Sequence, residues 1–197
     1  MRMSPIADAA QDKAPRRGNS LPIIAIILIG LMLACVLLMA LGAAVLFPVF
    51  RQARMAARRN DAISRMHNLA TAVRAYVADN DDHFPPAEAW MDLIGKYDPN
   101  GRDFHSPGMN RRNGFDPPDY GIAFMSSLSG GTLSTIKNPD SRVMLFDSTL
   151  RGRNATSGLE TLPKPPRFGP GETGGNILAF VDGHVRRVSA VDAVNLK

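Results

Sequence analysis

Cysteine is almost absent from this sequence: Cys35 is the single one in 197 residues. A lone thiol excludes an intramolecular disulfide and a cysteine-based metal cluster. Folded parts of the chain must therefore be held by packing and hydrogen bonds. Catalytic signatures are lacking too, since the sequence contains no Gly-rich phosphate loop, no G-x-S-x-G and no H-E-x-x-H. We therefore expect no enzymatic activity.

Charge is missing from one long stretch. Residues 21–50 are thirty consecutive residues without Asp, Glu, Lys or Arg. A helix of about 20 apolar residues crosses the hydrocarbon core of a bilayer, whereas the apolar part of a signal peptide is only about 7–15 residues long. The stretch predicts a transmembrane helix over 21–50, preceded by a disordered tail over 1–20. Four basic residues before it and five after it leave the orientation undecided by charge.

Glycine and proline are absent from Arg51 to Asp79, and the apolar residues there recur every three or four positions. This spacing indicates an amphipathic helix that continues the membrane helix over 51–84, in spite of Pro48. The acidic run Asp79–Asp82 and Pro85-Pro86 predict its end. The expected buried stripe contains Ile63, Met66, Leu69, Ala70, Val73, Tyr76 and Val77.

Residues 85–197 have the pattern of a small globular head. A short helix is expected over Ala87–Lys96, with Trp90, Leu93 and Ile94 facing inward. Strand-like runs follow at 120–128, 142–148, 176–181 and 184–188, separated by polar loops at 98–119 and 151–175. The predicted fold class is α+β: a long N-terminal helix followed by a small antiparallel sheet.

Several short motifs in this order resemble one bacterial family. They are Phe47-Pro48-Val49-Phe50, Asn68-Leu69, Tyr76, Asp79, Phe84-Pro85-Pro86 and the C-terminal Asp182-Gly183-His184. The chain is similar to type IV pilin-like and pseudopilin-like proteins, in particular to the prepilin-type family with a C-terminal His, nine residues and then Asp-Gly. The resemblance implies a pilin-like fold, a single pass through the inner membrane and a head on the extracytoplasmic side, in the periplasm or at the cell surface.

The chain departs from that family at three places. The family is cut after a glycine and carries a glutamate five residues farther on, but here Ile23 or Leu31 stands at that position, depending on the alignment. Glu172 replaces the first histidine of the C-terminal motif, and Ser106 stands where relatives often have cysteine. These departures put N-terminal processing and filament assembly in question.

The Asp182-Gly183-His184 motif has two interpretations. Asp-Gly between two strand-like runs favours a two-residue type I′ hairpin, in which Val181 would face His184. The alternative is chemistry: Asp147, Glu172, Asp182 and His184 could converge on a metal, or Asp182 and His184 could serve an anchored hydrolase. We favour the turn, with Phe47, Pro48, Glu172, Asp182, Gly183 and His184 as structural positions of the family motif.

Two charged runs invite ligand hypotheses. Asp79, Asp81 and Asp82 suit calcium, a cation that prefers oxygen ligands, but the run lacks the spacing of an EF-hand, so a solvated helix end is the favoured interpretation. The arginines from Arg51 to Arg59 follow the apolar stretch without interleaved aromatic residues. This pattern favours contact with lipid headgroups over nucleic acid.

The function that we expect is therefore a membrane-anchored structural or assembly protein, whose partners are the lipid bilayer and other pilin-like subunits packed against its N-terminal helix. The alternative is an uncleaved, membrane-tethered binding module that holds an ion, a ligand or a surface polymer through the loops at 98–119 and 151–175. No cofactor is expected, with calcium as the one candidate ion.

Overall fold

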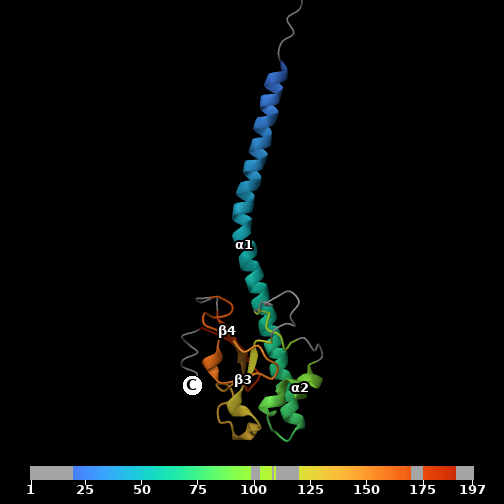
Figure 1. Ribbon diagram of the computed structural model, residues 1–197, viewed down its shortest axis with the longest axis vertical. Helices are drawn as coiled ribbons and strands as arrows, with labels where there is room; N and C mark the ends of the chain where they lie inside the picture. The colour runs from blue at the N-terminus through green and yellow to red at the C-terminus, as the bar shows by residue number, and fades with distance from the viewer. Residues whose placement is uncertain (1–19, 99–102, 108, 110–119, 170–174, 190–197) are drawn as a thin grey trace, which may run out of the picture. The chain divides into compact units, whose positions relative to one another are not determined.

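The computed structural model describes residues 20–98, 103–107, 109, 120–169 and 175–189. Two compact units divide the chain, residues 1–50 and residues 51–197. One helix, α1 (Ser20–Asp79), begins in the first unit and ends in the second, and Pro48 lies inside it without ending it (Figure 1). This confirms the prediction that the apolar run and the amphipathic run belong to one helix.

In the first unit, α1 exposes almost all of its apolar side chains. Those of its large hydrophobic residues from Ile23 to Phe50 whose side chains the structure describes are between 52% and 75% exposed. The helix is long and apolar enough to cross a membrane, by length and composition. Removal of apolar surface from water is favourable by about 25 cal/mol for every Å². Exposure of this surface is therefore unfavourable in water, and we expect a membrane or another chain to cover it.

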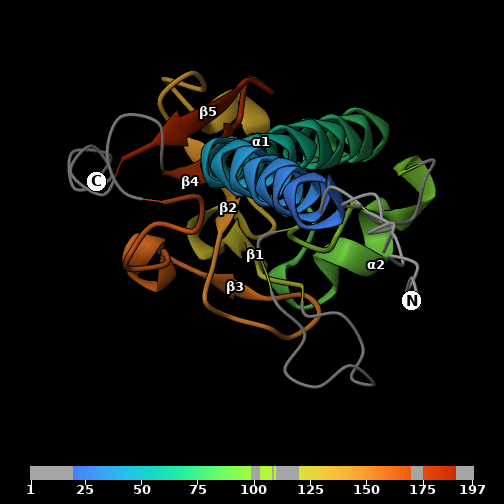
Figure 2. The ribbon, with the colours of Figure 1, turned by 90° about the horizontal axis from the view of Figure 1, so that it is seen from above.

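In the second unit, α1 packs against a mixed sheet of five strands (Figure 2). The predicted stripe is confirmed: Met66, Leu69, Ala70, Val73 and Val77 are at most 1% exposed, and Ile63 and Tyr76 are half-buried against them. The elements after α1 are the 3₁₀ turns η1 (Ala87–Ala89), η2 (Gly95–Tyr97), η3 (Ser126–Leu128), η4 (Leu133–Thr135) and η5 (Leu159–Thr161), the helix α2 (Trp90–Ile94), and the strands β1 (Ile122–Met125), β2 (Val143–Asp147), β3 (Thr156–Ser157), β4 (Asn176–Phe180) and β5 (Val185–Val188).

The strand order is β3-β1-β2-β4-β5. The pairs β1–β2, β2–β4 and β4–β5 are antiparallel, as predicted, but β3 runs parallel to β1. The expectation of a purely antiparallel sheet is therefore wrong at this edge. The two-residue strand β3 lies in a segment that was predicted to be loop, and the backbone amide of Phe124 donates to the carbonyl of Ala155 at 3.0 Å beside it.

Both faces of the sheet are buried. Ile122, Phe124, Leu145, Ile177 and Ala179 face α1, and Ala123, Phe146, Leu178 and Phe180 face a second core closed by Leu159 and Leu162. A β-bulge between Val143 and Leu145 turns both Met144 and Leu145 toward α1, because the extra residue breaks the strict alternation of the strand. Near-continuous apolar strands such as VMLFD and NILAF are the sequence mark of this double burial.

The short helix α2 closes one end of the core. Trp90 and Ile94 are fully buried, as predicted, and the Trp90 ring stacks on Phe124 with centroids 5.9 Å apart. The prediction was wrong for Leu93, which is only half-buried, and Met91 is buried in its stead. At 3.6 residues per turn, Trp90, Met91 and Ile94 lie within about 100° on one face, while Leu93 projects from its edge.

Truncation of the stripe tests this packing. Met66→Ala should lower the free energy of unfolding of residues 51–197 by about 2–5 kcal/mol, because it leaves a cavity in a closed core. Chemical denaturation of the detergent-solubilised chain, followed by the fluorescence of the single Trp90, measures the change. Met55→Ala on the same helix is the matched control, since Met55 is 42% exposed. Equal effects of the two substitutions would contradict the packing described.

Candidate functional site

The Asp-Gly-His motif lies in the turn between β4 and β5. The Phe180 amide donates to the His184 carbonyl at 2.9 Å, and the Gly183 amide donates to the Phe180 carbonyl at 2.9 Å. The loop therefore has three residues, and among them only Gly183 has a positive φ, 96°. A hairpin at this place is confirmed, but the two-residue type I′ turn is wrong.

The physical reason lies in the neighbours of Val181. Its amide donates to the Arg142 carbonyl at 2.9 Å, and its side chain is 1% exposed in the core beneath α1. Val181 is thus part of the loop and not the strand partner of His184. A three-residue loop that ends in one left-handed glycine satisfies these contacts, whereas type I′ would require a positive φ at Asp182 as well.

The turn joins three parts of the second unit. Arg74 of α1 donates through Nη1 to the Asp182 carbonyl at 2.5 Å. The Asp182 amide donates to the Pro139 carbonyl at 3.2 Å, just before β2. A side chain on Gly183 would collide with the Arg74 guanidinium, whose Nη1 lies 2.8 Å from an ideal Cβ. Glycine is therefore favoured here by its positive φ, and a Cβ would also displace the end of the flexible Arg74 side chain.

The Asp182 carboxylate is used within the turn. Its Oδ1 accepts the His184 amide at 3.0 Å and contacts the ring atom Nδ1 at 2.6 Å. The imidazole stacks on Phe180 with ring centroids 4.3 Å apart and planes 5° from parallel. Burial pushes the pKa of Asp182 upward, but the hydrogen bonds from His184 and the charges of His184 and Arg74 outweigh it, so the pKa is lowered.

The four residues considered as converging ligands are not gathered in one place. Asp147 accepts the Ile177 amide at 2.7 Å, at the start of β4, while Asp182 and His184 follow the end of that strand. Glu172 lies outside the described residues, so its contact with His184 stays a prediction. Within the ranges that the structure describes, no group of three or more His, Cys, Asp or Glu side chains could hold a metal ion.

A buried ion pair forms a second polar cluster. The side chains of Asp147 and Arg167 are 1% and 5% exposed, and Arg167 Nε lies 3.5 Å from Asp147 Oδ1. Ser106 Oγ donates to the same oxygen at 3.3 Å, and Arg167 Nη2 donates to the Ser148 carbonyl. The pair thus ties the segment at 103–107 and the segment before β4 to the end of β2.

Desolvation dominates the titration of this pair. Burial raises the pKa of Asp147, against the opposing effects of the Arg167 charge and of hydrogen bonds from the Ile177 amide and Ser106. Burial likewise lowers the pKa of Arg167, against the Asp147 charge. Neither Nε nor Nη1 of Arg167 makes a hydrogen bond of good geometry, since the Nε contact at 3.5 Å is long and poorly aligned. In the sequence, the signal for this cluster is Asp147, a carboxylate at the end of an apolar strand, because a buried carboxylate needs a partner. The sequence does not identify Arg167 as that partner.

The residue types around Asp147 invite comparison with a nucleophilic triad. His105 precedes Ser106, but its ring stacks on Tyr120 with centroids 4.6 Å apart, and its Nδ1 is buried without a hydrogen-bond partner. In a triad the histidine stands between the nucleophile and the acid, whereas here Ser106 donates to Asp147 directly. The arrangement therefore has the geometry of a structural ion pair.

The acidic run at 79–83 forms the C-terminal cap of α1. The Asp82 amide donates to the Val77 carbonyl at 3.0 Å, and Asp81 and Asp82 have φ of 51° and 59°. This six-to-one hydrogen bond with a left-handed Asp81 is a Schellman cap. Asp79 accepts the Tyr97 hydroxyl at 2.6 Å. The helix ends at Asp79, at the start of the acidic run that was predicted to weaken it, and does not continue to residue 84 as the predicted range implied. The calcium hypothesis for Asp79, Asp81 and Asp82 gains no geometric support.

The remaining motif positions, Phe47 and Pro48, lie on α1 in the first unit, where Phe47 is 66% exposed. The class that the fold defines is thus an α+β protein whose N-terminal helix could span a membrane. No protein-family model, curated protein or solved structure matches the chain.

A first prediction concerns the glycine of the turn. Gly183→Ala should lower the free energy of unfolding by about 1–3 kcal/mol, because alanine is strained at this φ and meets Arg74. Chemical denaturation measures the change. Gly95→Ala is the neutral control, since nothing lies within 4 Å and its φ is −57°. Gly130→Ala, with φ 62° but open space, isolates the backbone effect. If Gly183→Ala cost no more than Gly130→Ala, the collision with Arg74 would be refuted.

A second prediction concerns pH. The folded pKa of Asp182 is lowered from 3.8, so its ionised form stabilises the fold above that value. This contribution is lost as the pH falls through the lowered pKa. In denaturation curves between about pH 2 and 6, the stability difference between the wild type and Asp182→Asn should shrink toward acid. A difference independent of pH would contradict the assignment.

Proposed function

We propose that the chain is a membrane-anchored, pilin-like structural or assembly protein. The observation that supports the proposal most is α1 itself, a helix of 60 residues. Its first half exposes an uncharged apolar surface, and its second half supplies the stripe around which the sheet folds. This division suits a subunit whose first helical half is held by a bilayer or by neighbouring helices. The second half of the helix then carries the folded head.

In this proposal the bilayer or a neighbouring helix covers residues 22–50. Every backbone polar group of a helix is satisfied internally, so such a segment tolerates hydrocarbon on all sides. Arg54 and Arg58, which are exposed just beyond the apolar run, then reach the lipid headgroups. The second unit, residues 51–197, which contains the head, lies outside the cytoplasm by analogy with the pilin-like family.

Two polar features of the head support a structural role. The Asp-Gly-His turn binds α1 through Arg74, and the buried Asp147–Arg167 pair joins loops to β2. Each uses its charged groups on internal contacts. The missing glutamate at Ile23 or Leu31 and the loops at 98–119 and 151–175 keep the tethered binding module as the second hypothesis, although residues 99–102, 108, 110–119 and 170–174 lie outside the described part of those loops.

The single cysteine provides a direct test of helix packing. Cys35 lies in the apolar half of α1, and it is exposed. If identical helices pack against one another in the membrane, copper-phenanthroline oxidation of isolated membranes should yield a disulfide-linked dimer. The dimer should form through Cys35 in the wild type, or through Val36→Cys or Leu41→Cys, each in a Cys35→Ser background. At 3.6 residues per turn these three positions point to different sides of the helix. Gel electrophoresis without reducing agent detects the dimer.

The Cys35→Ser chain without a new cysteine is the control for non-specific bands. Absence of dimers at all three positions, together with a monomeric mass in mild detergent and no co-purified pilin-like chain, would refute the assembly role. The mass of the mature chain then distinguishes the variants of the hypothesis: loss of residues 1–18 indicates prepilin-type processing, and an intact N-terminus indicates a permanent anchor.

A further inference from the structure

A pocket of about 520 Å³ lies in the second unit, between the turn η3, the turn η4 and the start of β2. Its volume falls within the range of about 300–1,000 Å³ that is usual for small-molecule sites. The floor is apolar, since Phe84, Leu128 and Val143 are each at most 3% exposed. The pocket lies outside the loops at 98–119 and 151–175, and neither the turn of the Asp-Gly-His motif nor the Asp147–Arg167 pair lines it.

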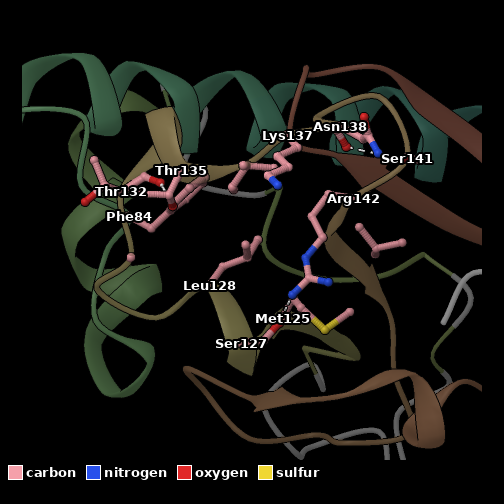
Figure 3. A pocket seen from close by; sticks show the side chains of 13 residues that line it. Phe84, Met125, Ser127, Leu128, Thr132, Thr135, Lys137, Asn138, Ser141 and Arg142 are labelled. Atoms are coloured by element: carbon pink, nitrogen blue, oxygen red, sulfur yellow. Dashed lines mark hydrogen bonds between the residues drawn. The ribbon is translucent and has the colours of Figure 1, made fainter.

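The rim of the pocket carries positive charge without a matching acid. Lys137 and Arg142 line it, and no aspartate or glutamate does. Both side chains are exposed, and neither has a carboxylate partner among the residues that the structure describes. In Figure 3 the charged ends of Lys137 and Arg142 turn toward the side of the pocket where Leu128 lies.

The guanidinium of Arg142 is held in place before any ligand arrives. Arg142 Nη2 donates to Ser127 Oγ at 2.7 Å, and the Arg142 carbonyl accepts the Val181 amide at 2.9 Å. The Ser127 hydroxyl keeps its own proton for a further acceptor, because it accepts in the bond with Arg142. Thr132, Asn138 and Ser141 add polar groups to the lining. A fixed guanidinium costs little ordering free energy when it binds an oxyanion.

We propose that this pocket binds a small organic anion whose carboxylate or phosphate lies between Lys137 and Arg142 and whose apolar part lies against Leu128 and Phe84. Two cations favour an oxyanion, since no carboxylate lines the pocket and none pairs with them among the described residues. The buried floor favours a ligand with an apolar body over a bare inorganic ion. This inference does not depend on the pilin-like function, because it uses only contacts within the second unit, those of the pocket lining and of Val181.

Calorimetric titration of the full chain in a non-ionic detergent tests the proposal, with empty micelles as the blank. The probes are benzoate, phenyl phosphate, inorganic phosphate and benzamide, the uncharged counterpart of benzoate. Benzoate or phenyl phosphate should bind, and benzamide should bind about tenfold more weakly or not at all, since it lacks the charge. The tighter of the two anions tells whether the site prefers carboxylate or phosphate.

Lys137→Met and Arg142→Gln should each weaken anion binding about tenfold. Lys137 has no ion-pair partner to lose among the described residues, so its substitution is expected to leave the fold intact. A circular dichroism spectrum checks the fold of both variants. Lys164→Met, an exposed lysine outside the pocket, is the matched control and should leave binding unchanged. The proposal is overturned if neither organic anion binds, if benzamide binds as tightly as benzoate, or if the two pocket variants bind like the wild type. Equal affinity for phosphate and phenyl phosphate would overturn the role of the apolar floor.

Discussion

The contact between the apolar stripe of α1 and the sheet is the interaction on which the second unit depends. Met66, Leu69 and Val73 have almost no exposed surface because β1, β2 and β4 close over them. In proteins most helical stability comes from the packing of an amphipathic face, so packing against the sheet supplies most of the stability of this part of α1. The sheet depends on α1 in turn, since no other described helix of comparable length covers its inner face.

Two polar devices hold the ends of β4 in this arrangement. At its start, the Asp147 carboxylate accepts the Ile177 amide and pairs with Arg167 inside the core. At its end, the Asp182 carbonyl accepts a hydrogen bond from Arg74 of α1. Burial of the Asp147–Arg167 pair carries a desolvation cost, and removal of one partner would strongly destabilise the fold because it would leave a buried charge unpaired. The hydrogen bond between Arg74 and the Asp182 carbonyl is exposed, and it depends on the backbone conformation at Gly183. The described contacts of the Asp-Gly-His motif are thus those of a turn that holds the end of β4 against α1.

The same turn reaches the pocket proposed as an anion site. The Val181 amide binds the Arg142 carbonyl, and Arg142 places its guanidinium at the rim through Ser127. A contact that stabilises the hairpin therefore also orders one wall of the pocket. In a membrane-anchored subunit, such a pocket would give the head a ligand or contact function separate from the assembly role of the helix.

The sequence by itself determined the features that depend on local pattern. Charge depletion over 21–50 and the three-to-four spacing from Ile63 to Val77 predicted one long helix and its buried stripe, and the acidic run predicted its end only to within a few residues, because helix period and helix capping are local properties. Only the tertiary structure decided the rest. Strand β3 has two residues and exists because Asn154 and Ala155 are held by contacts with α2, at Met91 and Trp90. Arg167 became the partner of Asp147 across 19 intervening residues, and Lys137, Arg142 and Phe84 came to line one pocket. These pairings are set by how distant segments pack, which the periodicity of any one segment does not encode.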